Sequence, residues 1–185
     1  MNRKSTIVCA AFAVAVFGLN PACAETFTPI PTLGTSVLDF DTQSGNYSGW
    51  QIADVSSINA IRTTLQVHRL GNDPRWIPTF SFILANGDRN VVFQLVSVKD
   101  NPPLFMFLKR HEGGKSADEQ QFSATIGVNE KLDVSIDWTP DGTVTVRAGK
   151  ETRTISLGAP VTSLQLSGST GEIEFNPLQI GRAAP

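Results

Sequence analysis

Apolar and polar side chains alternate at every second position through much of this sequence. The clearest case is LDVSIDWTPDGTVTVRAGKETRTISL, residues 132–157. Each of its runs has one apolar face and one polar face, which is the pattern of a β-strand with one buried side. The runs are separated by TPDG and AGK, where proline presets a turn dihedral and glycine accepts a positive φ. The segment therefore predicts a three-stranded antiparallel meander.

The same alternation occurs upstream. In AIRTTLQVHRL, residues 60–70, it places Arg62, Gln66 and His68 together on the polar face. TFSFILANGDRNVVFQLVSV predicts two strands joined at Asn86-Gly87, because both turn residues tolerate a positive φ. PLFMFLKRH is apolar on both faces at first, which favours a central or covered strand.

The C-terminal part of the chain predicts two further strands, SLQLSG at 163–168 and GEIEFNPLQIG at 171–181. Between the strands, HEGGKSADEQQ at 111–121 has the composition of a solvated loop. After the first 24 residues no window shows helical periodicity. About eight to twelve short strands with Gly, Pro, Asn and Asp turns predict an all-β fold, an antiparallel two-sheet β-sandwich.

The beginning of the chain predicts a cleavable signal peptide at residues 1–24. Arg3 and Lys4 are followed by an apolar run at 7–19, and Ala-Cys-Ala at 22–24 has the small-x-small pattern of a signal-peptidase site. The run is shorter than the roughly 20 apolar residues that span a bilayer. We expect a single β-sandwich domain at 25–185, periplasmic or secreted, without a transmembrane anchor. A lipoprotein signal that keeps the cysteine is the alternative.

Both cysteines, Cys9 and Cys23, lie inside the predicted signal peptide. The exported domain would therefore have no disulfide and would depend on its apolar core. Removal of Arg3 and Lys4 would change the formal net charge from −2 to −4. A chain of this charge is not expected to bind nucleic acid or an anionic membrane.

The meander, a leucine-containing strand and the closing EIEFNPLQIG together resemble laminin-G-like and other concanavalin A-like lectin/glucanase jelly rolls. In that superfamily a strand with a Val-x-Val/Ile-x-Trp pattern turns through Asp-Gly into the next strand, and a late strand ends in Ile-Gly. The resemblance covers roughly residues 36–182 as a strand pattern. It implies two curved sheets, often with sugar bound on the concave face or in edge loops.

The segment GEIEF raises the question of a catalytic carboxylate pair. A glucanase branch of the superfamily carries a similar Glu-Ile-Asp-x-x-Glu core, in which the first Glu is the nucleophile and the last is the acid/base. Glu172 matches the first position and Glu174 stands in place of the Asp, but the acid/base position falls on Asn176 or Pro177. Neither can donate a proton at neutral pH. Alternation instead predicts two solvated glutamates on an ordinary strand.

Gln66-Val67-His68 resembles the Gln-Ile/Val-His triplet of some alginate lyases on the same fold. Those enzymes also need a catalytic tyrosine on a late strand, whereas the only tyrosine here is Tyr47, upstream of the triplet. The sequence therefore predicts no catalytic residue and a domain that is not an enzyme.

The polar face of residues 60–70 is a candidate sugar-binding surface. Sugar recognition needs planar polar groups for the hydroxyls and an aromatic face for the apolar side of the ring. Two tryptophans in turn-rich segments can supply that face, or else merely close an end of the sandwich; Trp138, on the apolar face of its strand, is expected in the core. The candidate ligand-binding residues are Arg62, Gln66, His68, Trp50, Trp76 and Arg75.

Metal binding is not expected. Asp39 and Asp41 flank Phe40, and related folds hold Ca²⁺ with such carboxylates, but Ca²⁺ takes six to eight oxygens and no spacing here gathers them. His68 and His111 are the only histidines and have no cysteine beside them, which disfavours zinc. We predict no cofactor, with Ca²⁺ as the open alternative.

Three functions follow from these observations. The first is an exported, non-catalytic domain that binds carbohydrate, a glycan or polysaccharide, on a polar sheet face and edge loops. The second is a structural or protein-interaction module of the cell envelope without a sugar site. The third is a glycan hydrolase or lyase, which the missing acid/base and tyrosine disfavour.

Overall fold

The computed structural model describes residues 27–29, 35–98 and 101–183, and within these ranges all regular structure is β-strand. The described residues accordingly contain no helix long and apolar enough to cross a membrane. The predicted signal peptide, residues 1–24, lies outside them.

Eleven strands follow one another along the described residues. They are β1 (Phe27–Pro29), β2 (Thr35–Ile52), β3 (Ala60–Leu70), β4 (Thr79–Asn86), β5 (Arg89–Val98), β6 (Asn101–Glu112), β7 (Lys115–Ile126), β8 (Lys131–Trp138), β9 (Thr143–Ala148), β10 (Glu151–Ser156) and β11 (Ser163–Ala183). Every pairing between them is antiparallel. The predicted meander is confirmed as β8, β9 and β10.

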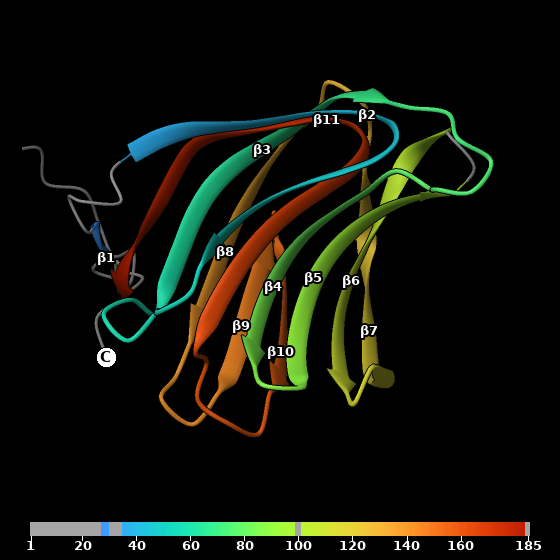
Figure 1. The fold of residues 1–185 in the computed structure, drawn as a ribbon. Helices are drawn as coiled ribbons and strands as arrows, with labels where there is room; N and C mark the ends of the chain where they lie inside the picture. The colour runs from blue at the N-terminus through green and yellow to red at the C-terminus, as the bar shows by residue number, and fades with distance from the viewer. Residues whose placement is uncertain (1–26, 30–34, 99–100, 184–185) are drawn as a thin grey trace, which may run out of the picture.

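The strands form two layers, with β4 and β5 in front of β9 and β10 in Figure 1. One layer, termed the β3 sheet, runs in the order β10-β9-β8-β3 and continues through the second half of β11 to the first half of β2. The other, termed the β5 sheet, runs from the second half of β2 through the first half of β11 to β4-β5-β6-β7. The predicted antiparallel two-sheet β-sandwich is confirmed.

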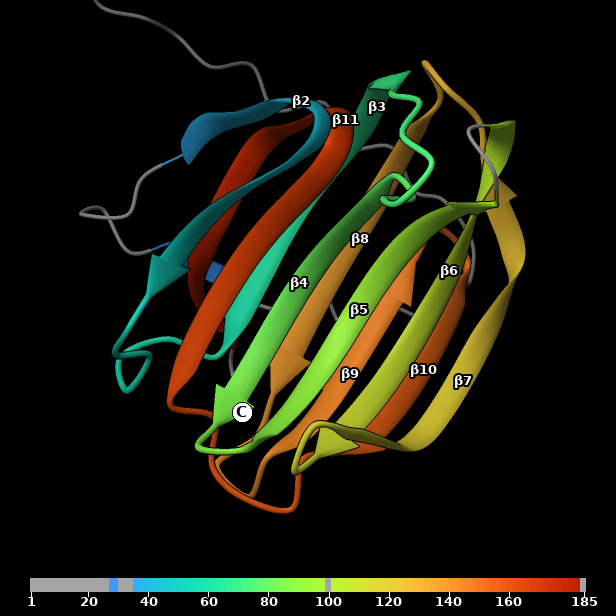
Figure 2. The ribbon, with the colours of Figure 1, turned by 45° about the vertical axis from the view of Figure 1, so that its right-hand side comes forward.

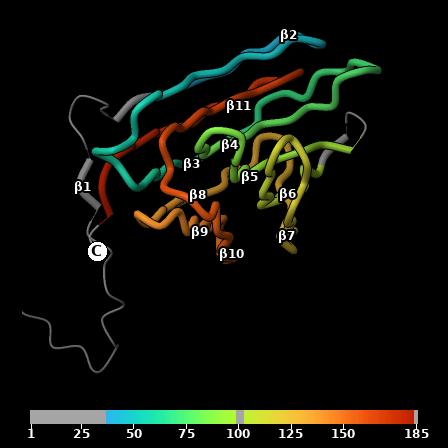
Figure 3. The backbone as a smooth tube through the Cα atoms, turned by 60° about the horizontal axis from the view of Figure 1, so that its bottom comes forward, coloured from blue at the N-terminus to red at the C-terminus, as the bar shows by residue number. Residues whose placement is uncertain are grey.

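Two long strands, β2 and β11, belong to both sheets and run side by side (Figure 3). β11 pairs with β4 up to Ser169 and with β3 from Gly171 onward. At the change of partner, between Ser169 and Gly171, Thr170 takes a left-handed φ of 55°. On the neighbouring strand β2, Gly45 takes a φ of 78°. The Thr170 hydroxyl accepts a hydrogen bond from the Gly45 N–H at 3.2 Å, so both strands turn at the same level. The two strands predicted at 163–168 and 171–181 are therefore one bent strand.

The core lies between the two sheets and is centred on aromatic rings. Phe175 of β11 is fully buried and meets Phe40 and Phe82 edge to face, at centroid distances of 6.0 and 5.4 Å. Because Phe40 and Phe175 lie in the β3-sheet halves of β2 and β11 and Phe82 lies in β4, these contacts join the layers. Edge-to-face contacts of this kind add to the free energy gained from burying the rings.

The edge strands β7 and β10 meet and close one side of the sandwich. The Glu151 carboxylate accepts hydrogen bonds from the backbone N–H groups of Ser123 and Ala124, at 3.0 and 2.7 Å. Arg153 pairs with Glu151 at 3.0 Å and lies over the Phe122 ring. These bonds occupy edge N–H groups that would otherwise be free to pair with another chain.

Two local predictions need correction. Residues 111–121 are not a loop: β6 continues to Glu112, the chain turns at Gly113-Gly114, and β7 begins at Lys115. This hairpin is polar on both faces because Lys115–Glu119 extend beyond the core and are exposed. The turn between β4 and β5 is also one residue later than predicted, at Gly87-Asp88, because Asn86 pairs with Arg89.

Replacement of Phe175 by alanine should be among the most destabilising single changes. We expect Phe175→Ala to lower the free energy of unfolding by about 3–5 kcal/mol, since it leaves a cavity between the sheets. Urea unfolding followed by circular dichroism measures the loss. Phe105→Ala, on the half-buried outer face of β6, is the control and should cost clearly less. Equal losses would contradict the arrangement of the core.

The Glu151 contacts make stability depend on pH. Hydrogen bonds from the Ser123 and Ala124 N–H groups, helped by Arg153, hold the pKa of Glu151 below its usual 4.5. The resulting stabilisation of the folded chain is present above the ordinary pKa of 4.5, and it is lost as the pH falls below that value. We expect Glu151→Gln to lower Tm at pH 7, and the difference from the parent to shrink below pH 4.5. Glu112→Gln, which removes only an exposed ion pair with Arg89, should change Tm little.

Candidate functional site

The predicted polar face of β3 is present on the outer surface of the β3 sheet. Arg62, Gln66 and His68 are half-buried there, while the alternate residues Ile61, Leu65 and others point into the core. Arg62 pairs with Asp137 at 2.8 Å and donates to the Ile61 carbonyl at 2.9 Å. Arg62 is thus held within the sheet surface.

At the far end of this face, carboxylates from β2 and β11 gather around Arg69. The Arg69 guanidinium lies 2.5 Å from the Asp41 carboxylate and 3.7 Å from that of Glu172. Glu174 lies 4.0 Å from the His68 ring nitrogen. Asp39 in the same group is exposed, but partial desolvation of its carboxylate, followed by the neighbouring charges of Glu172 and Glu174, raises its pKa.

The position of Glu172 and Glu174 supports the description of an ordinary strand. Both face solvent, and Ile173 and Phe175 on the opposite side of β11 are fully buried. Asn176 donates a hydrogen bond to Glu174 at 3.2 Å and supplies no proton for chemistry. In the part of the chain that the structure describes, no three His, Cys, Asp or Glu side chains gather so as to hold a metal ion.

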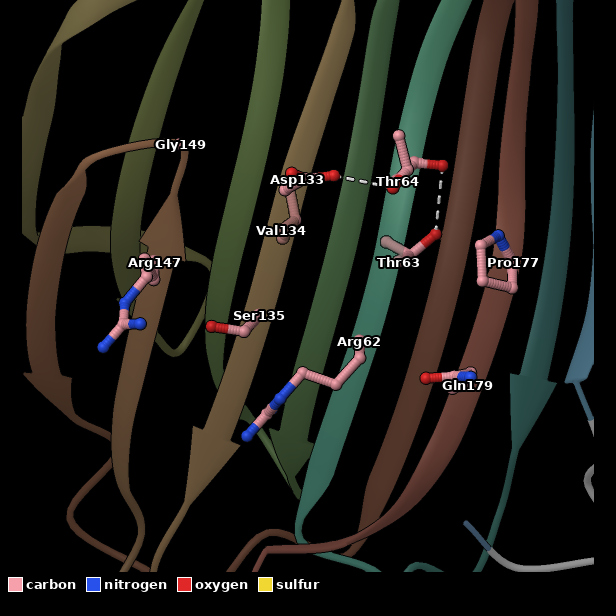
Figure 4. Close-up of a pocket in the computed structure, with 10 residues that line it drawn as sticks. All are labelled: Arg62, Thr63, Thr64, Asp133, Val134, Ser135, Arg147, Gly149, Pro177 and Gln179. Carbon is pink, nitrogen blue, oxygen red and sulfur yellow. Dashed lines mark hydrogen bonds between the residues drawn. The ribbon is translucent and has the colours of Figure 1, made fainter. Parts of the chain in front are cut away.

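A hollow of about 340 Å³, termed the Arg62 hollow, opens on the outer face of the β3 sheet (Figure 4). Its polar lining comes from β3, β8, β9 and β11. None of the described residues that line it is aromatic. Its lining includes Arg62, Thr64, Asp133, Ser135, Arg147 and Gln179.

A larger hollow of about 490 Å³, termed the Trp76 hollow, lies on the outer face of the β5 sheet. It is bounded by β2, β11, β4, β5 and β6 and by the connection between β3 and β4, seen above β4 in Figure 2. Its lining combines two exposed aromatic rings with planar polar groups. These residues include Tyr47, Trp76, Arg75, Asn90, Gln94 and His111.

The aromatic rings of this hollow are exposed although both are large. Tyr47 is 53% exposed and Trp76 is 45% exposed, whereas Trp138 in the core is 5% exposed, as predicted. The Tyr47 hydroxyl accepts a hydrogen bond from the Gln165 amide. The segment that carries Trp76 is fixed by a turn in which Asp73 accepts from the Arg75 N–H at 2.8 Å. One local hydrogen bond therefore fixes the Tyr47 hydroxyl, and another fixes the turn that precedes Trp76.

The polar groups are aligned by strand register. Asn90 of β5 pairs with His111 of β6, and the asparagine side-chain oxygen lies 3.0 Å from the histidine Nδ1. Gln94 of β5 pairs with Ser81 of β4. Two cross-strand rows of hydrogen-bonding side chains therefore form the floor of the Trp76 hollow.

The structure separates the candidate residues that the sequence grouped together. Trp76 and Arg75 line the Trp76 hollow, and Arg62 lines its own hollow on the opposite sheet. Trp50 is half-buried, packs against the core and lines neither hollow. Gln66 and His68 lie on the β3 face but outside the Arg62 hollow.

Sequence reasoning missed most of the Trp76 hollow, including Tyr47, Asn90, Gln94 and His111. The sequence does indicate part of this hollow, because Asn90 and Gln94 occupy polar positions of a strand in which apolar and polar residues alternate. His111 stands where the predicted strand PLFMFLKRH meets the predicted loop, and only the pairing of β5 with β6 brings it beside Asn90.

No protein family and no curated protein sequence matches this chain. Solved structures of similar fold include galectin LEC-6 of Caenorhabditis elegans, with a TM-score of 0.52 and 12% identity over 77% of this chain and 95% of the galectin. The carbohydrate-binding module CBM66 of Bacillus subtilis has a TM-score of 0.51 and 10% identity over 85% and 91%. The CBM2 module of the evolved Dit protein of Lactobacillus casei BL23 phage J-1 has a TM-score of 0.51 and 11% identity over 86% and 80%.

At these identities the likeness shows the fold alone. The similar structures are galectins and carbohydrate-binding modules, which is consistent with a lectin-type β-sandwich of the kind that the sequence resembles. The ligands of the galectins and carbohydrate-binding modules are properties of those proteins, and the similarity of fold does not assign them to this chain.

The carboxylate group around Arg69 gives a test of the β3 face. Because the pKa of Asp39 is raised, its charged form is disfavoured in the folded chain, and folding gains stability as the pH falls through that pKa. We expect Asp39→Asn to raise Tm at pH 7 and the gain to vanish below the ordinary pKa of 3.8. Thermal unfolding measures this. Asp88→Asn, at the exposed β4–β5 turn, should leave Tm unchanged, and a lower Tm for Asp39→Asn would contradict the expected repulsion.

Proposed function

We propose that this chain is an exported, non-catalytic β-sandwich domain that binds carbohydrate in the Trp76 hollow. One observation carries the proposal: two exposed aromatic rings stand beside rows of amide, imidazole and hydroxyl groups on one sheet face. This is the combination that sugar recognition needs.

Each part of the hollow has a role in such binding. The rings of Trp76 and Tyr47 offer flat apolar faces on which the C–H side of a sugar ring can pack. Gln94, Asn90 and His111 offer planar donors and acceptors for the hydroxyls. Exposure of a large aromatic ring leaves unburied apolar surface, which a sugar face would remove from water.

The fold agrees with this proposal. Galectins and carbohydrate-binding modules have similar structures, and the strand pattern resembles concanavalin A-like lectins. This likeness of fold supports the proposal, and the chemistry of the Trp76 hollow supports it independently. Export to the periplasm or the outside of the cell rests on the N-terminal signal pattern.

The distribution of acids favours binding over catalysis. No aspartate or glutamate is among the residues that line the Trp76 hollow, so the described site holds no carboxyl acid/base. Glu172 and Glu174 lie on the β3 sheet, away from this hollow, where Arg69 and His68 flank them. Glycoside hydrolysis generally uses two carboxyl groups beside the bound sugar.

Substitution of Trp76 tests the proposal. We expect the parent protein to bind at least one neutral oligosaccharide on a glycan array. Trp76→Ala should weaken that binding at least about tenfold in calorimetry, because removal of a central aromatic group commonly has such an effect. Gln94→Ala should also weaken it. Gln66→Ala, on the opposite sheet, is the matched control and should leave the affinity unchanged.

Other results would support the competing functions. Absence of binding across a broad glycan set, with and without Ca²⁺, would favour the structural or protein-interaction module. Turnover of β-glucan or alginate that disappears in Glu172→Gln or His68→Ala would show an enzyme.

A further inference from the structure

The Arg62 hollow lies across the core from the Trp76 hollow and shares no lining residue with it. Its chemistry also differs, because it has charged groups of both signs and no aromatic ring. A ligand here would be recognised by charge and hydrogen bonds rather than by stacking.

The side chains of the hollow form a row across four strands. Strand pairing places Gln179 of β11 beside Arg62 of β3, Arg62 beside Ser135 of β8, and Ser135 beside Arg147 of β9. Figure 4 shows Ser135 between the two arginines, with Gln179 beyond Arg62. With neighbouring strands about 4.8 Å apart, the two arginine backbones are roughly 10 Å apart.

The two arginines differ in what neutralises them. Arg62 is paired with Asp137, and its side chain is only 19% exposed, so it forms a fixed part of the floor. Arg147 is exposed, and among the described residues no acidic side chain lies within ion-pair distance of it. One guanidinium at the rim therefore carries an uncompensated positive charge.

A second row lies two residues away along β3 and β8. Thr64 pairs with Asp133, and the threonine hydroxyl donates to the aspartate carboxylate at 2.6 Å. Two residues of a strand span about 6.6 Å, so this carboxylate is separated from the arginine row. The hollow thus has a cationic end and an end that accepts hydrogen bonds.

We propose that the Arg62 hollow is a second binding site, for a saccharide whose sugar carries a carboxylate. Arg147 pairs with the carboxylate of the sugar, and Ser135 on the neighbouring strand donates a hydrogen bond beside it. Gln179, three strands from Arg147, donates to the saccharide farther along the row. Asp133 accepts from sugar hydroxyls at the other end. Charged hydrogen bonds of this kind are stronger than neutral ones, and guanidinium matches a carboxylate in geometry.

Calorimetry with matched charged and neutral probes tests the site. The probes are oligosaccharides of galacturonate, glucuronate, mannuronate and guluronate, each beside its methyl ester. We expect at least one acid to bind and its ester to bind about tenfold more weakly, since the ester lacks the charge. Arg147→Gln should weaken binding of the acid by a similar factor, and high salt should weaken it because Arg147 is exposed to screening ions. Arg147→Lys should keep part of the affinity.

Arg110→Gln on β6 removes a guanidinium elsewhere and should leave the affinity for the acid unchanged. Failure of all four acids to bind would overturn the proposal, as would equal affinity for acid and ester. Binding of the acid that disappears in Trp76→Ala but persists in Arg147→Gln would assign it to the other hollow. Binding of neutral sugar in the Trp76 hollow is measured separately, so either site can fail alone.

Discussion

The common turn of β2 and β11 is the constraint on which the rest of the sandwich depends. At Thr170 the backbone is left-handed, its hydroxyl accepts from Gly45, and its carbonyl accepts from Gly71 at 2.7 Å. A Cβ on Gly71 would lie 2.9 Å from the Thr170 carbonyl oxygen, so the crossing tolerates no side chain there. Because both strands turn together, each sheet receives half of the same antiparallel strand pair, and Phe175 is brought against Phe82 from the opposite sheet.

The two hollows follow from this arrangement. Alternate side chains of every strand point away from the shared core, so each sheet has an outer face of its own composition. Tyr47, Trp76 and the amides gather over the β5 sheet, while arginines and carboxylates gather over the β3 sheet. Flat apolar rings suit the C–H face of a neutral sugar, and guanidinium groups suit a carboxylate. The two outer faces therefore differ in chemistry on opposite sides of a single core.

The sequence predicts the strands well where one face is buried, and less well elsewhere. Period-two alternation identified β3 and the β8–β10 meander, and it placed Trp138 in the core. It failed for β7, where Lys115–Glu119 extend past the core and no apolar stripe is required. It could not assemble the Trp76 hollow, because Asn90 and His111 become neighbours only through strand register. Trp50 and Trp76 have similar turn-rich sequence contexts, but Trp50 lies in β2 and packs against the core, whereas Trp76 lies exposed in the connection between β3 and β4.

The place of β11 in the order of strands affects when the domain can fold. Every other described strand precedes it in the chain, yet β11 is an interior strand of both layers, between β2 and β3 and between β2 and β4. A nascent or partly translocated polypeptide that lacks residues 163–183 can complete neither layer and has no closed interior. Assembly of the native state must therefore wait until residues 163–183 are available for pairing.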